Sequence, residues 1–344
     1  MKSKRFRRLL EKYKAAPIEF QATSYWETYE ERIIETIDTM DINQLRSGIY
    51  PILSTFGFND VVHLYHPNMS FWKTLILKFI HKYIIKDRPI LPYGININNI
   101  QEMAFHHCEL VAKLSHSTMP NEIEVSTYGN PQDLFRIKDH SYTMAFLSYY
   151  IRYCFANKYM ILTGNETIVE LGSGSGYQIE VLKKIHPNLT ILCFDLPAQL
   201  FLCQEYLSNA IEHNIVGSDE TENWNDLSGI KKGSVHFMGN WQIPLLKKFK
   251  FDIFWNAASF GEMEPNIVEN YLSYIKGNAK WIYLLQARNG KETGGKNRVE
   301  NPIDFELYDK LLSGYSLHKD QDAWLANSKL SQSGGYFEGI WKEE

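Results

Sequence analysis

One stretch of the chain, residues 167–195, constrains the fold more than any other. It reads TIVELGSGSGYQIEVLKKIHPNLTILCFD. A short apolar run reaches Glu170, three glycines then alternate with serines from Gly172 to Gly176, and helical apolar spacing continues to Pro187. A second apolar run ends at Asp195. A strand, a glycine turn, a helix and a second strand that ends in an acid form the β-α-β unit that binds adenosine-containing cofactors.

The glycine loop distinguishes between two such cofactors. A dinucleotide loop needs a third glycine where its helix packs closely on the strand, and counting from Gly172 that position holds Tyr177. The loop closes one residue earlier, at Gly176, and the carboxylate of Glu170 would repel a pyrophosphate. The same carboxylate suits the ammonium group and positive sulfur of S-adenosylmethionine (SAM), while Asp195 can accept hydrogen bonds from both ribose hydroxyls. We therefore predict SAM as the cofactor; the alternatives are a nicotinamide dinucleotide and a tight turn that binds no ligand.

Composition narrows the remaining classes of protein. With 344 residues and 44% apolar content, the chain can bury a full core, and we expect one catalytic domain plus an added segment. A net charge of −4 argues against a general nucleic-acid-binding protein, whose surface would be basic. The basic N-terminus lacks the apolar core of a signal peptide, and basic side chains interrupt the longest apolar stretch, residues 71–85, so we expect no transmembrane segment. The cysteines lack C-x-x-C spacing and are typical of buried side chains in a reducing compartment, which favours a cytoplasmic protein.

Hydrophobic periodicity divides the chain into two regions. Residues 1–125 form a helical N-terminal region, expected to serve as a lid or to make acceptor or oligomer contacts, with helices predicted over 5–14, 24–40, 70–86 and 98–115. A connecting segment, 119–139, contains the turn Tyr128-Gly129-Asn130-Pro131, and a further helix is predicted from Tyr142 to Asn157.

Strands alternate with helices through residues 126–344, which we predict to be the SAM-binding domain. The pattern predicts a Rossmann-like, doubly wound α/β fold with a mostly parallel seven-stranded sheet and an N-terminal helical extension. Its later strands are predicted over 235–238, 251–255, 281–286, 315–318 and 336–341, and its later helices over 199–213, 267–275 and 303–312. Glu170, Asp195, Asn240 and Asn256 each follow or end a predicted strand, and ligands bind at the carboxyl ends of such strands.

The element order and the E-x-G-x-G-x-G loop resemble class I SAM-dependent methyltransferases. Three segments resemble, more narrowly, the sugar O-methyltransferase family found among bacterial surface-polysaccharide genes: Tyr128-Gly-Asn-Pro131, Phe194-Asp-Leu-Pro197 and Asn256-Ala-Ala-Ser-Phe-Gly-Glu-Met263. The resemblance covers roughly residues 126–290. Family members often carry a G-G-x-G-G type loop, whereas Ser173 and Ser175 stand between the glycines here.

The resemblance implies a set of cofactor contacts. Glu170 and the loop residues Gly172, Ser173, Gly174 and Gly176 would hold the methionine part, and Asp195 would hold the ribose. The adenine would lie between Leu196 and the segment Gly239-Asn240-Trp241, with Asn256 at the neighbouring strand end, and Tyr142 would lie near the sulfonium, where an aromatic face attracts a cation. For Tyr142 and Trp241 the alternative is ordinary aromatic core packing.

The predicted reaction is methyl transfer to a hydroxyl of a sugar, a sugar nucleotide or a glycan. A hydroxyl acceptor profits from a general base, for which Glu262 is the first candidate and His140 the second. Ser259, Arg288 and Asn289 are predicted to bind the acceptor. The alternatives are capping of the next helix for Glu262 and a loop hydrogen bond for His140. Alternative functions are methyl transfer to another small hydroxylated metabolite and a non-catalytic SAM-fold subunit held to a partner.

A metal site is not predicted. His318, Asp320 and Asp322 alternate and would face the same way on a strand, but paired acids at this spacing are common on solvated strands. The expected partner is a small-molecule or carbohydrate acceptor. The N-terminal helices fit a lid over the acceptor and a dimer interface equally well, so a second copy of the chain is an open alternative.

Overall fold

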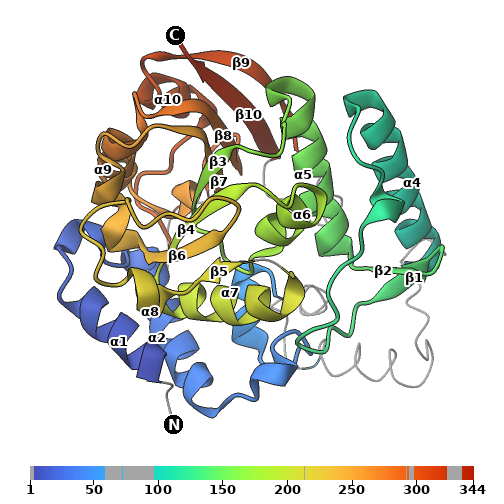
Figure 1. The fold of residues 1–344 in the computed structure, drawn as a ribbon, viewed down its shortest axis with the longest axis horizontal. Helices are drawn as coiled ribbons and strands as arrows, with labels where there is room; N and C mark the ends of the chain where they lie inside the picture. Colours follow the sequence, from blue (N-terminus) through green and yellow to red (C-terminus); the bar gives the residue numbers. More distant parts are fainter. Residues whose placement is uncertain are drawn as a thin grey trace.

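A twisted eight-stranded sheet lies at the centre of the molecule (Figure 1). The computed structural model describes residues 4–58, 72, 97–212, 214–291, 293, 298–323 and 335–344. The helix predicted over 70–86 therefore lies outside the described residues, except at residue 72. The strand order is β5-β6-β4-β3-β7-β8-β10-β9. The strands are β3 (Thr167–Leu171), β4 (Thr190–Asp195), β5 (Ile215–Val216), β6 (Val235–Gly239), β7 (Phe251–Ala257), β8 (Ala279–Ala287), β9 (Tyr315–Asp322) and β10 (Tyr336–Glu343).

The order in which strands are added to the sheet reverses at β3. Strands β4 and β6 are added on one side of β3, and β7 and β8 are then added on the other side, all in parallel register. Among the described strands of this sheet, β10 alone runs opposite to the others, and it pairs in antiparallel register with β8 and β9. This confirms the predicted doubly wound, mostly parallel sheet, with one strand more than expected. The additional strand, β5, pairs at the edge with β6, and two residues are too short for an alternating pattern to show.

Alternation along the strands separates two hydrophobic cores. Ile168 and Ile191 face one core and their neighbours Val169 and Leu192 face the other, as the two-residue period of a strand requires. Helices α5 (Met144–Met160), α6 (Tyr177–Ile185) and α7 (Pro197–Ala210) cover the first face, and α9 (Pro265–Ile275) and α10 (Phe305–Leu311) cover the second.

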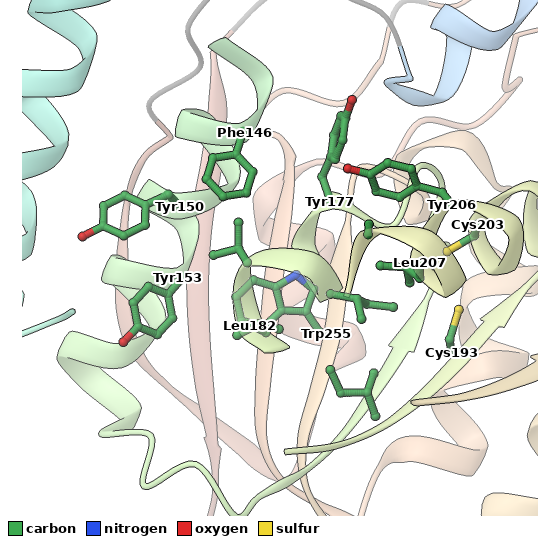
Figure 2. Packing of buried hydrophobic residues seen from close by; sticks show 14 of the residues in the cluster. Phe146, Tyr150, Tyr153, Tyr177, Leu182, Cys193, Cys203, Tyr206, Leu207 and Trp255 are labelled. Atoms are coloured by element: carbon green, nitrogen blue, oxygen red, sulfur yellow. The ribbon is translucent and has the colours of Figure 1, made fainter. Parts of the chain in front are cut away.

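Figure 2 shows how the first face is filled. Aromatic side chains of α5 and Leu182 of α6 gather over Trp255 of β7, which stacks on Tyr283 of β8 at a ring-centroid distance of 3.9 Å. Cys193 and Cys203 lie in the same layer, and all four cysteines are free and buried, as predicted for their side chains. Their placement shows that they serve as small apolar residues.

The N-terminal helices pack against the helices of the sheet. Helices α1 (Lys4–Lys14) and α2 (Ser24–Thr39) contact α7, with the short helix η1 (Ile18–Phe20) between them, and α4 (Ile97–Ser115) contacts α5. The rings of Phe6 in α1 and Phe201 in α7 lie 4.9 Å apart, and both residues belong to the first core. The helices within the described ranges are all too short or too polar to cross a membrane.

A hairpin lies mostly within the predicted connecting segment and ends at Tyr142, where the sequence predicted the start of a helix. Strands β1 (Phe135–Ile137) and β2 (His140–Tyr142) pair in antiparallel register, and the two turn residues, Lys138 and Asp139, both have positive φ. The prediction that the helix begins at Tyr142 is wrong: α5 begins at Met144, after Thr143, whose hydroxyl accepts a hydrogen bond from the Phe146 N–H. Lys-Asp is not one of the Gly- and Asn-rich pairs that signal such turns, so the hairpin had no clear local signature.

Candidate active site

The glycine loop follows β3 at the point where the chain reverses. Gly172, Gly174 and Gly176 all have positive φ, the region of backbone space that glycine enters without strain. A Cβ at Gly172 would lie 2.5 Å from the side chain of Ser259, and one at Gly176 would lie 3.0 Å from Cys203 Sγ. Two of the three glycines therefore meet both a conformational and a steric requirement.

Asp195, at the end of β4, holds the glycine loop in place. Its Oδ2 accepts a hydrogen bond from the Gly174 N–H at 2.9 Å, and its Oδ1 accepts one from the Leu196 N–H at 2.8 Å. Burial nevertheless raises the pKa of Asp195 to about 7, although the backbone bonds act to lower it. Each carboxylate oxygen can still accept a further hydrogen bond, so the side chain can both support the loop and bind a hydroxyl.

Glu170 lies at the end of β3 and is only 4% exposed. Burial raises its pKa to about 8; the hydroxyl of Ser173 acts to lower the pKa, the charge of Asp195 raises it, and Arg152 lowers it. Its Oε2 has no hydrogen-bond partner among the described residues. The same holds for the buried Oγ of Ser175 in the loop. These orphaned polar atoms indicate that this edge of the sheet is built to receive a polar ligand.

Asn256, at the end of β7, supports the loop from below. Its Nδ2 donates to the Leu171 carbonyl at 2.9 Å and to Ser259 Oγ at 2.6 Å. Its Oδ1 accepts from the Phe260 N–H and from Gln286 Nε2. Both polar atoms of the amide are therefore hydrogen-bonded within the protein, and the bond to Ser259 holds that side chain beside Gly172. The sequence predicted instead that Asn256 contacts the cofactor directly.

The segment Gly239-Asn240-Trp241 follows β6 and meets the N-terminal region. Asn240 Nδ2 donates to the Phe20 carbonyl at 2.6 Å and to Tyr271 Oη at 2.8 Å, while its buried Oδ1 has no partner among the described residues. The Trp241 ring covers Gly239 and lies 5.8 Å from the ring of Tyr13. The free Oδ1 is suited to accept a hydrogen bond from an amino group.

Tyr177 has a role that its bulk alone did not suggest. The guanidinium of the buried Arg46 lies over its ring, at 4.8 Å from the centroid. Arg46 Nη1 donates to the carbonyls of Ser126 and Tyr128, and its backbone N–H donates to the Gly129 carbonyl. The Tyr128–Pro131 turn therefore docks the N-terminal region beside the start of α6.

Glu262 belongs to a charged cluster on the other side of Ser259. Its Oε2 accepts from Trp26 Nε1 at 2.7 Å, and its Oε1 forms an ion pair with Lys291. Burial acts to lower the pKa of the Lys291 ammonium, but the charge of Glu262 raises it overall, and Lys291 also lies 5.0 Å from the centre of the Tyr25 ring. Helix α9 begins after Glu264, so Glu262 does not occupy the capping position that was its predicted alternative.

His140 and Tyr142 lie on the hairpin beside α4. Tyr142 is fully buried, its ring is 5.1 Å from Phe105 of α4, and its hydroxyl donates to the Pro120 carbonyl at 3.1 Å. His140 Nδ1 is 3.0 Å from the Lys138 carbonyl. The structure does not bring these two residues together with the glycine loop. Their positions match the alternatives, core packing and a loop hydrogen bond.

Arg288 pairs with the acids that had been considered as metal ligands. Its guanidinium lies 3.1 Å from an Asp320 oxygen and 3.2 Å from an Asp322 oxygen on β9, and Asn289 is exposed in the turn that follows β8. The ring of His318 instead contacts Trp281. In the described part of the chain, no group of three or more histidine, cysteine, aspartate or glutamate side chains is arranged to hold a metal ion.

Two residues that sequence analysis missed complete the surroundings of the site. Lys291 pairs with Glu262, and Glu30 of α2 lies within electrostatic range of Asp195. Lys291 had no local signal. Glu30 had one, because it interrupts the apolar face that Trp26, Ile33 and Ile37 define on the predicted helix, and an acid in that position calls for a partner.

The chain resembles solved methyltransferase structures over slightly more than half its length. It is 15% identical to a SAM-dependent methyltransferase from Aquifex aeolicus, covering 56% of this chain and 88% of that one, with a TM-score of 0.37. It is 10% identical to the mitomycin 7-O-methyltransferase MmcR, covering 58% of this chain and 57% of that one, with a TM-score of 0.36. It is also 10% identical to the magnesium protoporphyrin IX methyltransferase ChlM from Synechocystis, solved with bound SAM, covering 54% of this chain and 74% of that one, with a TM-score of 0.35. No family model and no curated protein matches the chain. These identities and TM-scores assign no activity, which must be inferred from the site itself.

Proposed function

We propose that the protein is a SAM-dependent methyltransferase whose cofactor lies across the carboxyl ends of β3, β4 and β6. The observation that carries the proposal is the pair of buried carboxylates, Glu170 and Asp195, that flank the glycine loop. Burial raises the pKa of both groups, so ionising them costs free energy that a cationic ligand would offset. A cationic nucleoside with hydroxyl donors would compensate both acids, whereas a pyrophosphate would add two more negative charges.

The residues at this edge fit the parts of SAM. Glu170 and the loop N–H groups would hold the methionine part, and Asp195 would accept from the ribose hydroxyls. Leu196 and Trp241 would border the adenine, whose amino group would donate to the free Oδ1 of Asn240. When bound, the cofactor supplies an activated methyl group for an in-line displacement.

The acceptor is proposed to lie over the ends of β7 and β8. Ser259 and the Glu262–Lys291 pair stand there beside the aromatic rings of Tyr25 and Trp26, which are 5.9 Å apart. Aromatic surfaces with a few placed polar groups are typical of small-molecule sites. The charge of Glu262 also acts on Asp195, so this cluster lies within electrostatic range of the cofactor acid.

We propose a hydroxyl of a sugar, a sugar nucleotide or a glycan as the methyl acceptor. The three segments that resemble sugar O-methyltransferases support this choice, since two of them, Phe194–Pro197 and Asn256–Met263, contribute to the edge where the site lies. Holding the hydroxyl in line with the methyl group is worth on the order of 7–11 kcal/mol. Glu262 would accept the hydroxyl proton, for which it must release one of its present donors, and such a base contributes roughly 10²–10⁴-fold.

Isothermal titration of the full chain tests the cofactor, and a mass-spectrometric screen tests the acceptor. We expect SAM and S-adenosylhomocysteine to bind competitively and NADH not to bind. Incubation with SAM and a panel of hexoses and nucleotide sugars should yield one product that gains a methyl group. Binding of NADH in place of SAM would overturn the proposal. Methylation of non-sugar hydroxyl compounds alone would retain the enzyme and reject the sugar.

A further inference from the structure

Glu30 reaches from the N-terminal region to the tip of β4. It lies on α2, is 4% exposed, and its Oε1 accepts a hydrogen bond from the Ala198 N–H at 3.1 Å. Ala198 is in the first turn of α7, and this helix begins directly after Leu196, whose N–H donates to Asp195. Two carboxylates from segments 165 positions apart in the sequence therefore meet at the same helix N-terminus, and their charges act on each other.

Capping of α7 accounts for only one of the two oxygens of the Glu30 carboxylate. The N-cap residue, Leu196, has no side-chain acceptor, so Glu30 satisfies a backbone donor that would otherwise be orphaned. The second oxygen, Oε2, is buried and forms no hydrogen bond of ordinary geometry among the described residues. The side chain of Gln199 lies near enough to act on the pKa of Glu30 and lower it, yet both polar atoms of that amide are themselves buried without a hydrogen-bond partner among the described residues. A buried carboxylate oxygen without a donor is costly, and a serine or aspartate at position 196 would cap the helix without that cost. The unpaired oxygen of Glu30 and the unpaired amide of Gln199 beside it thus indicate a polar ligand.

The neighbouring contacts identify the part of the ligand that Glu30 faces. The segment that leads into α2 contacts the tip of β6, where the Phe20 carbonyl binds Asn240 and the Tyr13 ring lies against Trp241. Glu30 itself lies beside Asp195 at the tip of β4. The N-terminal region therefore borders the sites proposed for ribose and adenine, whose hydroxyl and amino groups are hydrogen-bond donors.

We propose that Glu30 is a cofactor-binding residue whose free Oε2 accepts a hydrogen bond from the adenosine part of SAM, beside Asp195. The inference rests on the proposed function. It makes α2 a wall of the cofactor pocket, so that the N-terminal region and the sheet form the site together. A cofactor-binding residue on α2 cannot be predicted from the glycine loop or from the acid at the end of β4.

The test compares Glu30→Gln with Glu31→Gln in the full chain. Glutamine keeps an oxygen for the Ala198 N–H but removes the charge, and Glu31 is exposed on the same helix. Affinities for SAM, S-adenosylhomocysteine and 5′-methylthioadenosine are measured by titration, and the melting temperature is measured without ligand. We expect Glu30→Gln to weaken all three ligands by the same factor, about tenfold, because all three contain adenosine. Glu31→Gln should leave all three affinities unchanged.

The possible outcomes separate this inference from the proposed function. If the wild-type chain binds the ligands and Glu30→Gln changes only the melting temperature, Glu30 is a helix cap and the inference fails alone. If only SAM binding weakens, Glu30 acts on the sulfonium charge, and the assignment to adenosine is wrong. If the wild-type chain binds none of the three ligands, the proposed function fails and the inference fails with it.

Discussion

The two sides of the candidate site differ in whether their charged side chains are paired within the protein. At the tips of β3 and β4, Glu170 and Asp195 are buried with raised pKa values, and Glu170 keeps an oxygen without a partner. Over β7 and β8, Glu262 and Lys291 form an ion pair, and Arg288 pairs with two aspartates. Unpaired buried charge is costly and points to an absent ligand, whereas paired charge already contributes to the fold. The cofactor side is therefore better defined than the acceptor side.

The strongest challenge to this comparison is Asp195→Ala. The variant removes the proposed hydrogen bonds to the ribose hydroxyls, and we expect SAM affinity to fall by about a hundredfold, or roughly 2.8 kcal/mol. Isothermal titration measures the change, with Asp226→Ala as the control because Asp226 is an exposed acid in a turn. An unchanged affinity in a folded variant would place the cofactor elsewhere.

A smaller effect is expected from breaking the ion pair on the acceptor side. Lys291→Met leaves the partly buried Glu262 without its cation, so we expect the free energy of unfolding to fall by about 2 kcal/mol, between the values for exposed and buried pairs. SAM affinity should stay within about threefold, since the pair is not among the proposed cofactor contacts. Urea denaturation measures the change. The double variant with Glu262→Gln should recover part of the loss; a purely additive result would show that the two side chains do not stabilise each other.

The acids on the cofactor side also predict a pH dependence. Burial raises the pKa of Glu30 and Glu170 to about 8 and that of Asp195 to about 7, while Arg152 beside Glu170 lowers the pKa and Glu262 near Asp195 raises it. The ligand-free fold thus binds protons that the unfolded chain releases above about pH 4, so its stability falls as the pH rises towards 8. A bound cation favours the ionised carboxylates.

We therefore expect the rise in melting temperature that SAM produces to be larger at about pH 8.5 than at about pH 6, by an amount equivalent to roughly 1–2 kcal/mol. Thermal unfolding with and without SAM measures it. Titration in two buffers of different ionisation enthalpy should also show proton release near neutral pH. Proton uptake, or a larger shift at the lower pH, would contradict the proposed compensation.

The smallest effect is expected at Arg288. Because its ion pairs with Asp320 and Asp322 are partly exposed, Arg288→Ala should cost no more than about 1 kcal/mol of stability and leave SAM affinity unchanged. Chemical denaturation and titration measure both quantities. A raised KM for a nucleotide sugar, with kcat unchanged, would support the prediction that Arg288 binds the acceptor.

Local sequence was informative where one segment carries its own chemistry. The glycine loop, Asp195 and the alternation of strands and helices lie within short windows, and the predicted order of elements corresponds to the observed parallel sheet. Strand β5 and the β1–β2 hairpin were not predicted because strands of two or three residues are too short to show a hydrophobic alternation.

The site depends also on contacts that no local pattern can show. Glu262 meets Trp26 across 236 positions of sequence, and its other partner, Lys291, follows a different strand. Strand ends and loop chemistry can nominate Glu262, but they cannot reveal that both its oxygens are already engaged. Tertiary packing decides whether a nominated acid is free to react.

The bond from Asn240 to the Phe20 carbonyl also orders events during synthesis. The first helices leave the ribosome some 220 positions ahead of the strand tip that receives them. At typical translation rates of about 5–20 residues per second, the Phe20 carbonyl waits roughly 10–45 seconds for Asn240. The apolar face around Phe6 has a partner earlier, when Phe201 of α7 emerges. Nascent chains stalled before α7 should therefore expose the apolar faces of the first helices to chaperones, and synthesis past α7 should end the exposure.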